Sequence, residues 1–142
     1  MSIVIYTAGG ARNNPGPAGI GVVIYDGDPV SNPEGAQRPA EVSEYLGKQT
    51  NNWAEYAGVI RALTKAQELG LCDKKIEVRL DSKLVAEQLM GSWRVKEPTL
   101  KPQYEKARTL IQACKHITFV HVRREYNAEA DRLANEAMDR AQ

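Results

Sequence analysis

A change in the spacing of apolar residues near residue 50 constrains the fold more than any other feature of this sequence. Before it, runs rich in Val, Ile and Tyr at residues 3–6 and 19–25 predict β-strands. From residue 52 to 69 the apolar residues recur three or four positions apart, which predicts an amphipathic helix, and Gly70 supplies its stop. A chain that changes period in this way is an α/β protein whose first part is a strand meander.

The remaining segments complete a mixed sheet. A turn-rich loop at 26–39 precedes a third strand at 41–48, and a fourth strand at 75–80 leads into a helix at 82–90. A helix at 104–113, a strand at 117–122 and a last helix, capped by Asn127 and running to about Arg140, follow. We therefore predict three antiparallel strands and then two parallel ones, with helices on both faces, as one domain over residues 1–142.

Composition restricts the function only weakly. The formal net charge is +1, so a nucleic-acid partner would be held by a local patch and not by a general basic field. Cys72 and Cys114 are 42 residues apart and form no CxxC or Cys/His pattern, which predicts two free thiols suited to a reducing cytosol. With no signal-peptide pattern and no long apolar window, we expect a cytoplasmic protein without membrane contact, monomeric by default.

Three carboxylates occupy positions where an apolar or capping residue would be routine. Glu55 shares the face of the first long helix that should be buried, although with Asn52 as N-cap it could complete a capping box. Asp81 ends a strand and could cap the next helix. Asp131 lies on the apolar stripe of the last helix, where exposure of the helix start is the alternative.

These three acids would meet only if the sheet brings two helix starts and a strand end to one edge, which a parallel-type edge does readily. Clustered carboxylates repel each other unless a hard divalent cation neutralises them. The pattern therefore favours phosphodiester hydrolysis with Mg²⁺, or with Mn²⁺ as the alternative ion, in a site that would hold two ions.

Five short motifs, in register from residue 3 to about 138, carry a family resemblance. They are Tyr6-Thr7-Ala8-Gly9-Gly10, Asn14-Pro15-Gly16-Pro17, Thr50-Asn51-Asn52-Trp53-Ala54-Glu55, Leu80-Asp81-Ser82 and Asn127-Ala128-Glu129-Ala130-Asp131. Together they resemble type 1 ribonuclease H. The resemblance implies the ribonuclease H fold and endonucleolytic cleavage of the RNA strand of RNA/DNA hybrids.

The resemblance also implies an Asp-Glu-Asp-Asp metal site, which maps onto position 8, Glu55, Asp81 and Asp131. Position 8 departs from the pattern because it is Ala8, which offers no oxygen where the family's aspartate would bridge both metals. We expect little or no turnover in this chain. An engineered block and a natural loss both fit, and the second would leave a non-catalytic module that binds RNA/DNA hybrids.

Further residues map onto the family's substrate contacts. Asn14, Asn51 and Asn52 match positions that contact the minor groove, where 2′-hydroxyls identify the RNA strand. Lys48 and Thr50 match a pocket for a DNA-strand phosphate. Turn and cap chemistry is the alternative explanation for these residues. The asparagine-rich segment also argues against a DNA-cutting nuclease of the same fold, such as a junction resolvase.

Two other features vary within the family. A histidine on the loop before the last acid assists product release or proton transfer, and here His121, Arg123 and Arg124 compete for that role. The short stretch from Gly91 to Pro98 resembles a compact form that lacks the extra basic helix and loop some relatives use to hold substrate.

Overall fold

The computed structural model describes residues 2–141 and contains one five-stranded sheet. The strands are β1 (Ser2–Ala11), β2 (Gly16–Asp26), β3 (Gln37–Gln49), β4 (Lys75–Leu80) and β5 (His116–His121). The helices are α1 (Asn51–Glu68), α2 (Lys83–Leu89), α3 (Lys101–Gln112) and α4 (Ala128–Arg140), with a short 3₁₀ turn, η1 (Arg124–Tyr126), before α4. None of the helices in this described part is long and apolar enough to cross a membrane.

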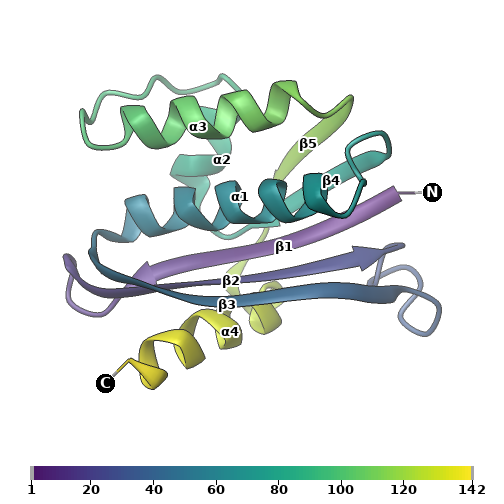
Figure 1. Ribbon diagram of the computed structural model, residues 1–142, viewed down its shortest axis with the longest axis horizontal. Helices are drawn as coiled ribbons and strands as arrows, with labels where there is room; N and C mark the ends of the chain where they lie inside the picture. The colour runs from purple at the N-terminus through teal and green to yellow at the C-terminus, as the bar shows by residue number, and fades with distance from the viewer. Residues whose placement is uncertain (1, 142) are drawn as a thin grey trace.

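The strand order is β3-β2-β1-β4-β5, and β1 is the central strand (Figure 1). β1 pairs antiparallel with β2 and β2 antiparallel with β3, whereas β4 lies parallel to β1 and β5 parallel to β4. Residues 3–8 of β1 are all buried, as expected of a strand that is covered on both faces. The predicted mixed sheet, with three antiparallel strands followed by two parallel ones, is confirmed.

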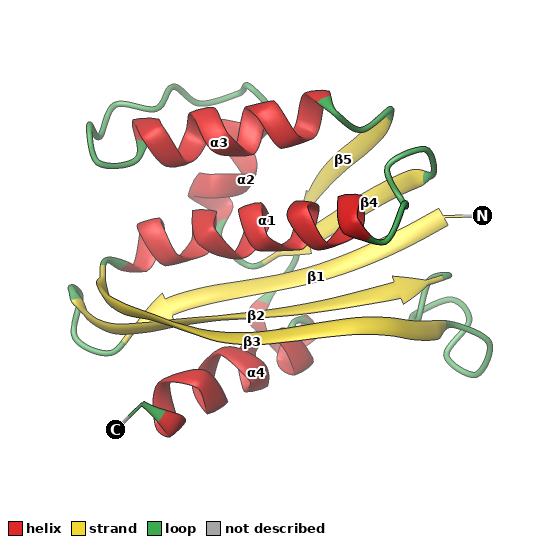
Figure 2. Cartoon of the chain, in the orientation of Figure 1, coloured by secondary structure: helices red, strands yellow, loops and turns green. Residues whose placement is uncertain are grey.

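The helices form two layers of unequal size (Figures 1 and 2). α1, α2 and α3 cover one face of the sheet, and their apolar residues share the main core with the side chains of Ile3, Ile5, Val78 and Leu80. α4 alone covers the other face, over a smaller cluster that contains Val4, Tyr6 and Ala8. Successive residues of β1 therefore serve two different cores, as the alternation of a strand requires.

Two glycines set how closely the helices approach the sheet. A Cβ on Gly9 would lie 2.3 Å from the backbone oxygen of Ala54, so α1 rests on β1 at a distance that only glycine permits. A Cβ on Gly21 would collide with the backbone oxygen of Ala130 in the same way, so α4 rests directly on β2. These approaches bring the starts of α1 and α4 to the same end of the central strands.

Several helices and strands are longer than predicted. The first strand was predicted at residues 3–6, but β1 continues to Ala11, and within it Gly9 and Gly10 pair with Ile20 and Gly19 of β2. α3 begins at Lys101 instead of residue 104, since Pro102 is tolerated in the first turn of a helix. Strand pairing and helix packing therefore extend these elements beyond the residues that local sequence signals indicate.

The prediction of two free thiols was wrong, because a disulfide joins Cys72 to Cys114. Each cysteine lies just before one of the neighbouring parallel strands β4 and β5, and their Cα atoms are 4.4 Å apart. The backbone N–H of Lys115 also donates to the carbonyl of Cys72 at 3.0 Å. Sequence spacing alone could not indicate this proximity, which depends on the pairing of β4 with β5.

Candidate active site

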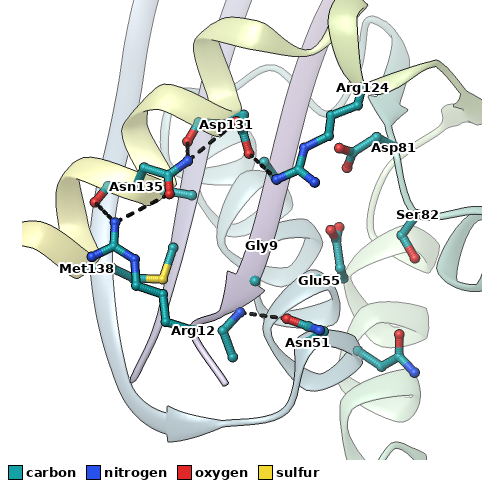
Figure 3. A pocket seen from close by; sticks show the side chains of 15 residues that line it. Gly9, Arg12, Asn51, Glu55, Asp81, Ser82, Arg124, Asp131, Asn135 and Met138 are labelled. Carbon is teal, nitrogen blue, oxygen red and sulfur yellow. Dashed lines mark hydrogen bonds and ion pairs between the residues drawn. The ribbon is translucent and has the colours of Figure 1, made fainter. Parts of the chain in front are cut away.

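A polar pocket of about 540 Å³ lies where the carboxyl ends of β1 and β4 meet the starts of α1 and α4 (Figure 3). β1 and β4 run in parallel with Thr7 aligned to Leu80, so the residues that follow, Ala8 and Asp81, lie at the same edge. Glu55 enters from α1 and Asp131 from α4. The structure thus brings the three predicted carboxylates, hereafter the acidic cluster (Glu55, Asp81 and Asp131), to one pocket.

Glu55 is a partly exposed residue whose carboxylate oxygen Oε2 is buried. Its helix approaches β1 at Gly9, which points the carboxylate into the pocket and not toward solvent. Burial, followed by the negative charge of Asp81, raises the pKa of Glu55 well above its ordinary value, while a hydrogen bond from the Gly9 backbone and the charge of Arg124 oppose that rise. A carboxylate held here is costly to ionise without a cation.

The capping explanation for Glu55 and Asn52 is wrong. Thr50 is the N-cap of α1, and its hydroxyl accepts a hydrogen bond from the Trp53 backbone N–H at 3.2 Å. Asn52 is already inside the helix, and Glu55 lies beyond the N3 position of a capping box. Its burial therefore has no explanation in helix capping.

Asp81 is likewise not a cap. Ser82 caps α2 and accepts from the Val85 backbone N–H at 3.3 Å, which leaves the Asp81 carboxylate free to face the pocket. Burial raises the pKa of Asp81, and the charge of Arg124 opposes the effect. Helix capping is thus excluded as the role of Glu55 and of Asp81, because Thr50 and Ser82 cap the two helices instead.

Asp131 is held by partners on either side. Arg124 of η1 donates to one Asp131 carboxylate oxygen at 3.4 Å, and the Asn135 amide lies 3.4 Å from the other (Figure 3). The start of α4 is fixed by Asn127, which is the N-cap residue as predicted but makes no side-chain capping bond. Its amide nitrogen instead donates to the buried carbonyl of Thr7 at 2.8 Å, which ties α4 to β1.

Ala8 lines the same pocket as the three acids and is only 3% exposed. Its methyl group belongs to the small apolar cluster beneath α4, together with Ala130 and Ala134. The backbone at this position pairs with Gly21 of β2. Position 8 therefore lines the pocket, but its side chain carries no oxygen or nitrogen atom.

The remaining donors fit a hard divalent cation in type. Glu55 Oε2 and Asp81 Oδ1 are buried without a hydrogen-bond partner among residues 2–141, a state that a bound cation would relieve. In the same part of the chain, no three His, Cys, Asp or Glu side chains stand close enough together to hold an ion as they are. The site thus has unsatisfied oxygens and lacks an oxygen at position 8.

Of the residues predicted to contact the groove, Asn51 and Asn52 line this pocket. The Asn51 backbone N–H donates to Asn14 Oδ1 at 2.9 Å. The Ala11 backbone N–H donates to Asn51 Oδ1 at 2.7 Å, a bond drawn in Figure 3. The side-chain oxygens of Asn14 and Asn51 therefore both accept from a backbone N–H. The side-chain amide nitrogen of each asparagine points away from the N–H group that its oxygen binds. Asn52 lines the pocket, whereas Lys48 is exposed near the end of β3 and Thr50 is exposed between β3 and α1; neither Lys48 nor Thr50 lines the pocket.

Of the three candidates for the loop position, only Arg124 lines the pocket. His121, the last residue of β5, and Arg123 are exposed but do not line it. The 3₁₀ turn carries Arg124 back toward Asp131, which a count of residues before that acid did not anticipate.

Sequence reasoning missed two residues on the pocket wall, Arg12 and Asn135. Asn135 is four residues after Asp131 and so lies on the same face of α4, a spacing that could have indicated it. Arg12 lies in the turn after β1, and nothing local indicates that α4 passes beside it.

Comparison with known proteins finds a matching family profile and several similar sequences. A sequence profile for the family described as "Reverse transcriptase-like" matches residues 6–137. The ribonuclease HI of Synechocystis is 31% identical in an alignment 148 positions long, which covers 94% of this chain and 85% of that protein. The bifunctional protein Rv2228c of Mycobacterium tuberculosis is 43% identical over 141 residues. This chain spans only 36% of the length of that mycobacterial relative.

Solved structures agree with these relatives. The structure of LC11-RNase H1 in complex with an RNA/DNA hybrid matches with a TM-score of 0.88 and 48% identity, covering 98% of each chain. The RNase H1 of the halophilic archaeon Halobacterium salinarum matches with the same TM-score at 38% identity, covering 99% of each chain.

Proposed function

Because this chain belongs to the ribonuclease H family, we propose that it binds RNA/DNA hybrids and that its acidic cluster is the centre where the RNA strand is cut. The observation that carries the proposal is the convergence of three carboxylates in one pocket, two of them with buried oxygens that lack partners. A homologue of nearly equal length, LC11-RNase H1, is described in complex with such a hybrid.

Glu55, Asp81 and Asp131 would hold the divalent metal, Mg²⁺ in preference to Mn²⁺. A pair of such ions supplies an activated water and neutralises the leaving oxygen when an intact site is loaded. The chain's own part is to present oxygens at fixed positions: the backbone of Gly9 orients Glu55, and the cap at Ser82 leaves Asp81 free. Arg124 and Asn135 orient Asp131 from opposite sides.

We propose that Ala8 reduces this activity strongly. Position 8 lines the same pocket as the acids, and alanine offers the ions no carboxylate oxygen there. An engineered block and a natural loss both remain compatible with an otherwise complete site. In either case the chain would bind a hybrid without cutting it efficiently, so the second candidate function is a hybrid-binding module.

The substrate would lie across the turn after β1 and the start of α1. Asn14, Asn51 and Asn52 would direct amide groups to the minor groove, and the 2′-hydroxyls there would identify the RNA strand. Lys48 and Thr50 would meet a phosphate of the DNA strand. Asn51 and Asn52 line the same pocket as the acidic cluster and Asn14 is hydrogen-bonded to Asn51, which supports binding of the hybrid next to the acids.

We assign the loop role to Arg124 in preference to His121 or Arg123, because Arg124 alone of the three lines the pocket. Its guanidinium is cationic and offers several N–H donors, so this side chain would attract a phosphate and assist product release. We further propose a compact domain over residues 1–142 without a basic protrusion, monomeric and cytoplasmic.

Reversion of position 8 tests the proposal. Ala8→Asp should restore Mg²⁺-dependent cleavage of the RNA strand in a uniform RNA/DNA duplex, with the unmodified chain and Ala8→Asn as controls that bind but do not cut. If the revertant binds the hybrid but fails to cut it with either Mg²⁺ or Mn²⁺, the chain is a binding module. If no variant binds the hybrid, the proposed function is wrong.

A further inference from the structure

Arg12 is a basic side chain on the wall of the acidic pocket, and none of the roles above uses it. It lies in the turn between β1 and β2, where its backbone N–H donates to the Pro17 carbonyl at 2.9 Å and so fixes the position of the residue. Its side chain is one-third exposed, enough to reach both the protein and a ligand. It lines the same pocket as Glu55, Asp81 and Asp131.

One end of the Arg12 guanidinium is anchored to α4. Nη2 lies 2.7 Å from the Asp139 carboxylate and 3.4 Å from both the backbone oxygen and the side-chain oxygen of Asn135 (Figure 3). All three contacts use the same nitrogen. Within residues 2–141 we find no contact of Nη1 or Nε, so the other N–H groups of the fork remain for a further acceptor.

Asn135 connects this anchor to the acidic cluster. Its amide nitrogen lies 3.0 Å from the backbone oxygen of Asp131 and 3.4 Å from the carboxylate, and Arg124 contacts the same carboxylate from the far side. Two guanidinium groups therefore flank Asp131, as Figure 3 shows. A strand whose scissile phosphate lies over the acids would pass one of these groups on each side.

We propose that Arg12 binds a backbone phosphate of the RNA strand, next to the phosphate that is positioned over the acidic cluster. The inference rests on the proposed function, since it requires a hybrid in this pocket. A planar guanidinium with free N–H groups suits the bidentate recognition of phosphate oxygens. The RNA strand is the one contacted because the strand to be cut must enter the pocket that Arg12 lines.

Hybrid affinity tests the inference without any need for turnover. The chain as it exists, with Ala8, can be mixed with an RNA/DNA duplex and Mg²⁺, and the Kd measured against salt concentration. Arg12→Gln should weaken binding about 10-fold near 0.1 M salt, and the slope of log K against log[salt] should become shallower by about 0.9, the value for one lost phosphate contact. Arg108→Gln on α3, away from the pocket, is the charge-matched control and should change neither quantity.

A second variant separates a phosphate ligand from a structural support. Asp139→Asn removes the anchoring charge but keeps the guanidinium, so a purely structural role predicts that it weakens binding as much as Arg12→Gln. A phosphate contact predicts unchanged or tighter binding, because a competing carboxylate has been removed. Equal losses in the two variants would therefore overturn the inference.

Neutral phosphate analogues assign the strand. A methylphosphonate placed in the RNA strand beside the target bond should weaken binding by the unmodified chain but add nothing to the loss in Arg12→Gln, as expected when two changes remove the same contact. Additive losses at every RNA position, or coupling to a DNA position only, would refute the assignment. A failure of all variants to bind the hybrid would instead refute the proposed function.

Discussion

Restoring a carboxylate at position 8 should destabilise the protein in the absence of metal and make its stability depend on Mg²⁺. The residue at this position is 3% exposed and lies in the pocket with Glu55, Asp81 and Asp131. Burial already raises the pKa of both Glu55 and Asp81. A fourth carboxylate would meet the same loss of solvation and the repulsion of the other three.

The magnitude follows from the pKa of the introduced group. If the pKa of an aspartate at position 8 is raised by about one to two units, its ionisation costs about 1.4 to 2.7 kcal/mol of folding free energy. Unfolding entropy is about 2.1 cal/mol/K per residue, or about 0.3 kcal/mol/K for 142 residues, so the Tm should fall by about 5 to 9 °C.

The sign of the pH dependence is fixed. A folded-state pKa above the unfolded value of about 3.9 means that the unfolded chain releases its proton first. The penalty is therefore absent below about pH 4, grows as the pH rises from there to the folded pKa, and is constant above it. Ala8→Asp should match its neutral control at pH 4 and be less stable than it at pH 8.

Thermal unfolding at pH 4 and pH 8, with EDTA and with Mg²⁺, is the assay, and Ala8→Asn is the control because it has nearly the same volume without the charge. Mg²⁺ at about 100 times its Kd should raise the free energy of unfolding of Ala8→Asp, and of this variant alone, by about 2.7 kcal/mol. The reasoning is refuted if Ala8→Asp and Ala8→Asn have the same Tm at pH 8 in EDTA and neither responds to Mg²⁺.

Three further changes test the elements that build the pocket. Gly9→Ala should cost about 1 to 3 kcal/mol in urea unfolding and weaken hybrid binding, because the new Cβ would lie 2.3 Å from the α1 backbone; an unchanged midpoint would contradict this close approach. Asn127→Ala should cost about 1 to 3 kcal/mol by leaving a buried carbonyl of β1 without its 2.8 Å partner, and a neutral effect would show that water replaces it. Reduction of the Cys72–Cys114 disulfide, which closes a loop with a sequence separation of 42, should lower the free energy of unfolding by up to about 4 kcal/mol. Hybrid affinity should not change, because the disulfide lies at the opposite end of β4 from Asp81. Two reactive thiols in the untreated protein would exclude the bond.

Much of the fold was accessible from the sequence because hydrophobic period and turn chemistry are local signals. The order of strands and helices followed from them, and the convergence of Glu55, Asp81 and Asp131 followed from the parallel edge that this order implies. Local signals were least reliable where several capping residues stand together. Thr50, Asn51 and Asn52 can all cap a helix, and the choice of Thr50 depends on where β3 ends.

Contacts between distant segments could not be read from the sequence. Cys72 and Cys114 are brought together only by the pairing of β4 with β5, and Arg12 meets Asn135 only because α4 crosses the sheet beside the turn after β1. The role of Asn127 changed for a similar reason: its side chain leaves the helix cap for a carbonyl of the central strand. In each case tertiary packing decided between local options of comparable energy.

The backbone around position 8 explains how one side chain can change the chemistry without changing the fold. The strand is held there by its pairing with Gly21 and by the close approach of α1 at Gly9 and Gly58, and all of these contacts are made by backbone atoms. An aspartate at position 8 should therefore occupy the same place on the pocket wall as alanine. Since the groove contacts at Asn14 and Asn51 are also anchored to backbone groups, they too should be independent of residue 8. We therefore expect hybrid binding and hydrolysis to be separable in this chain, with position 8 as the residue that separates them.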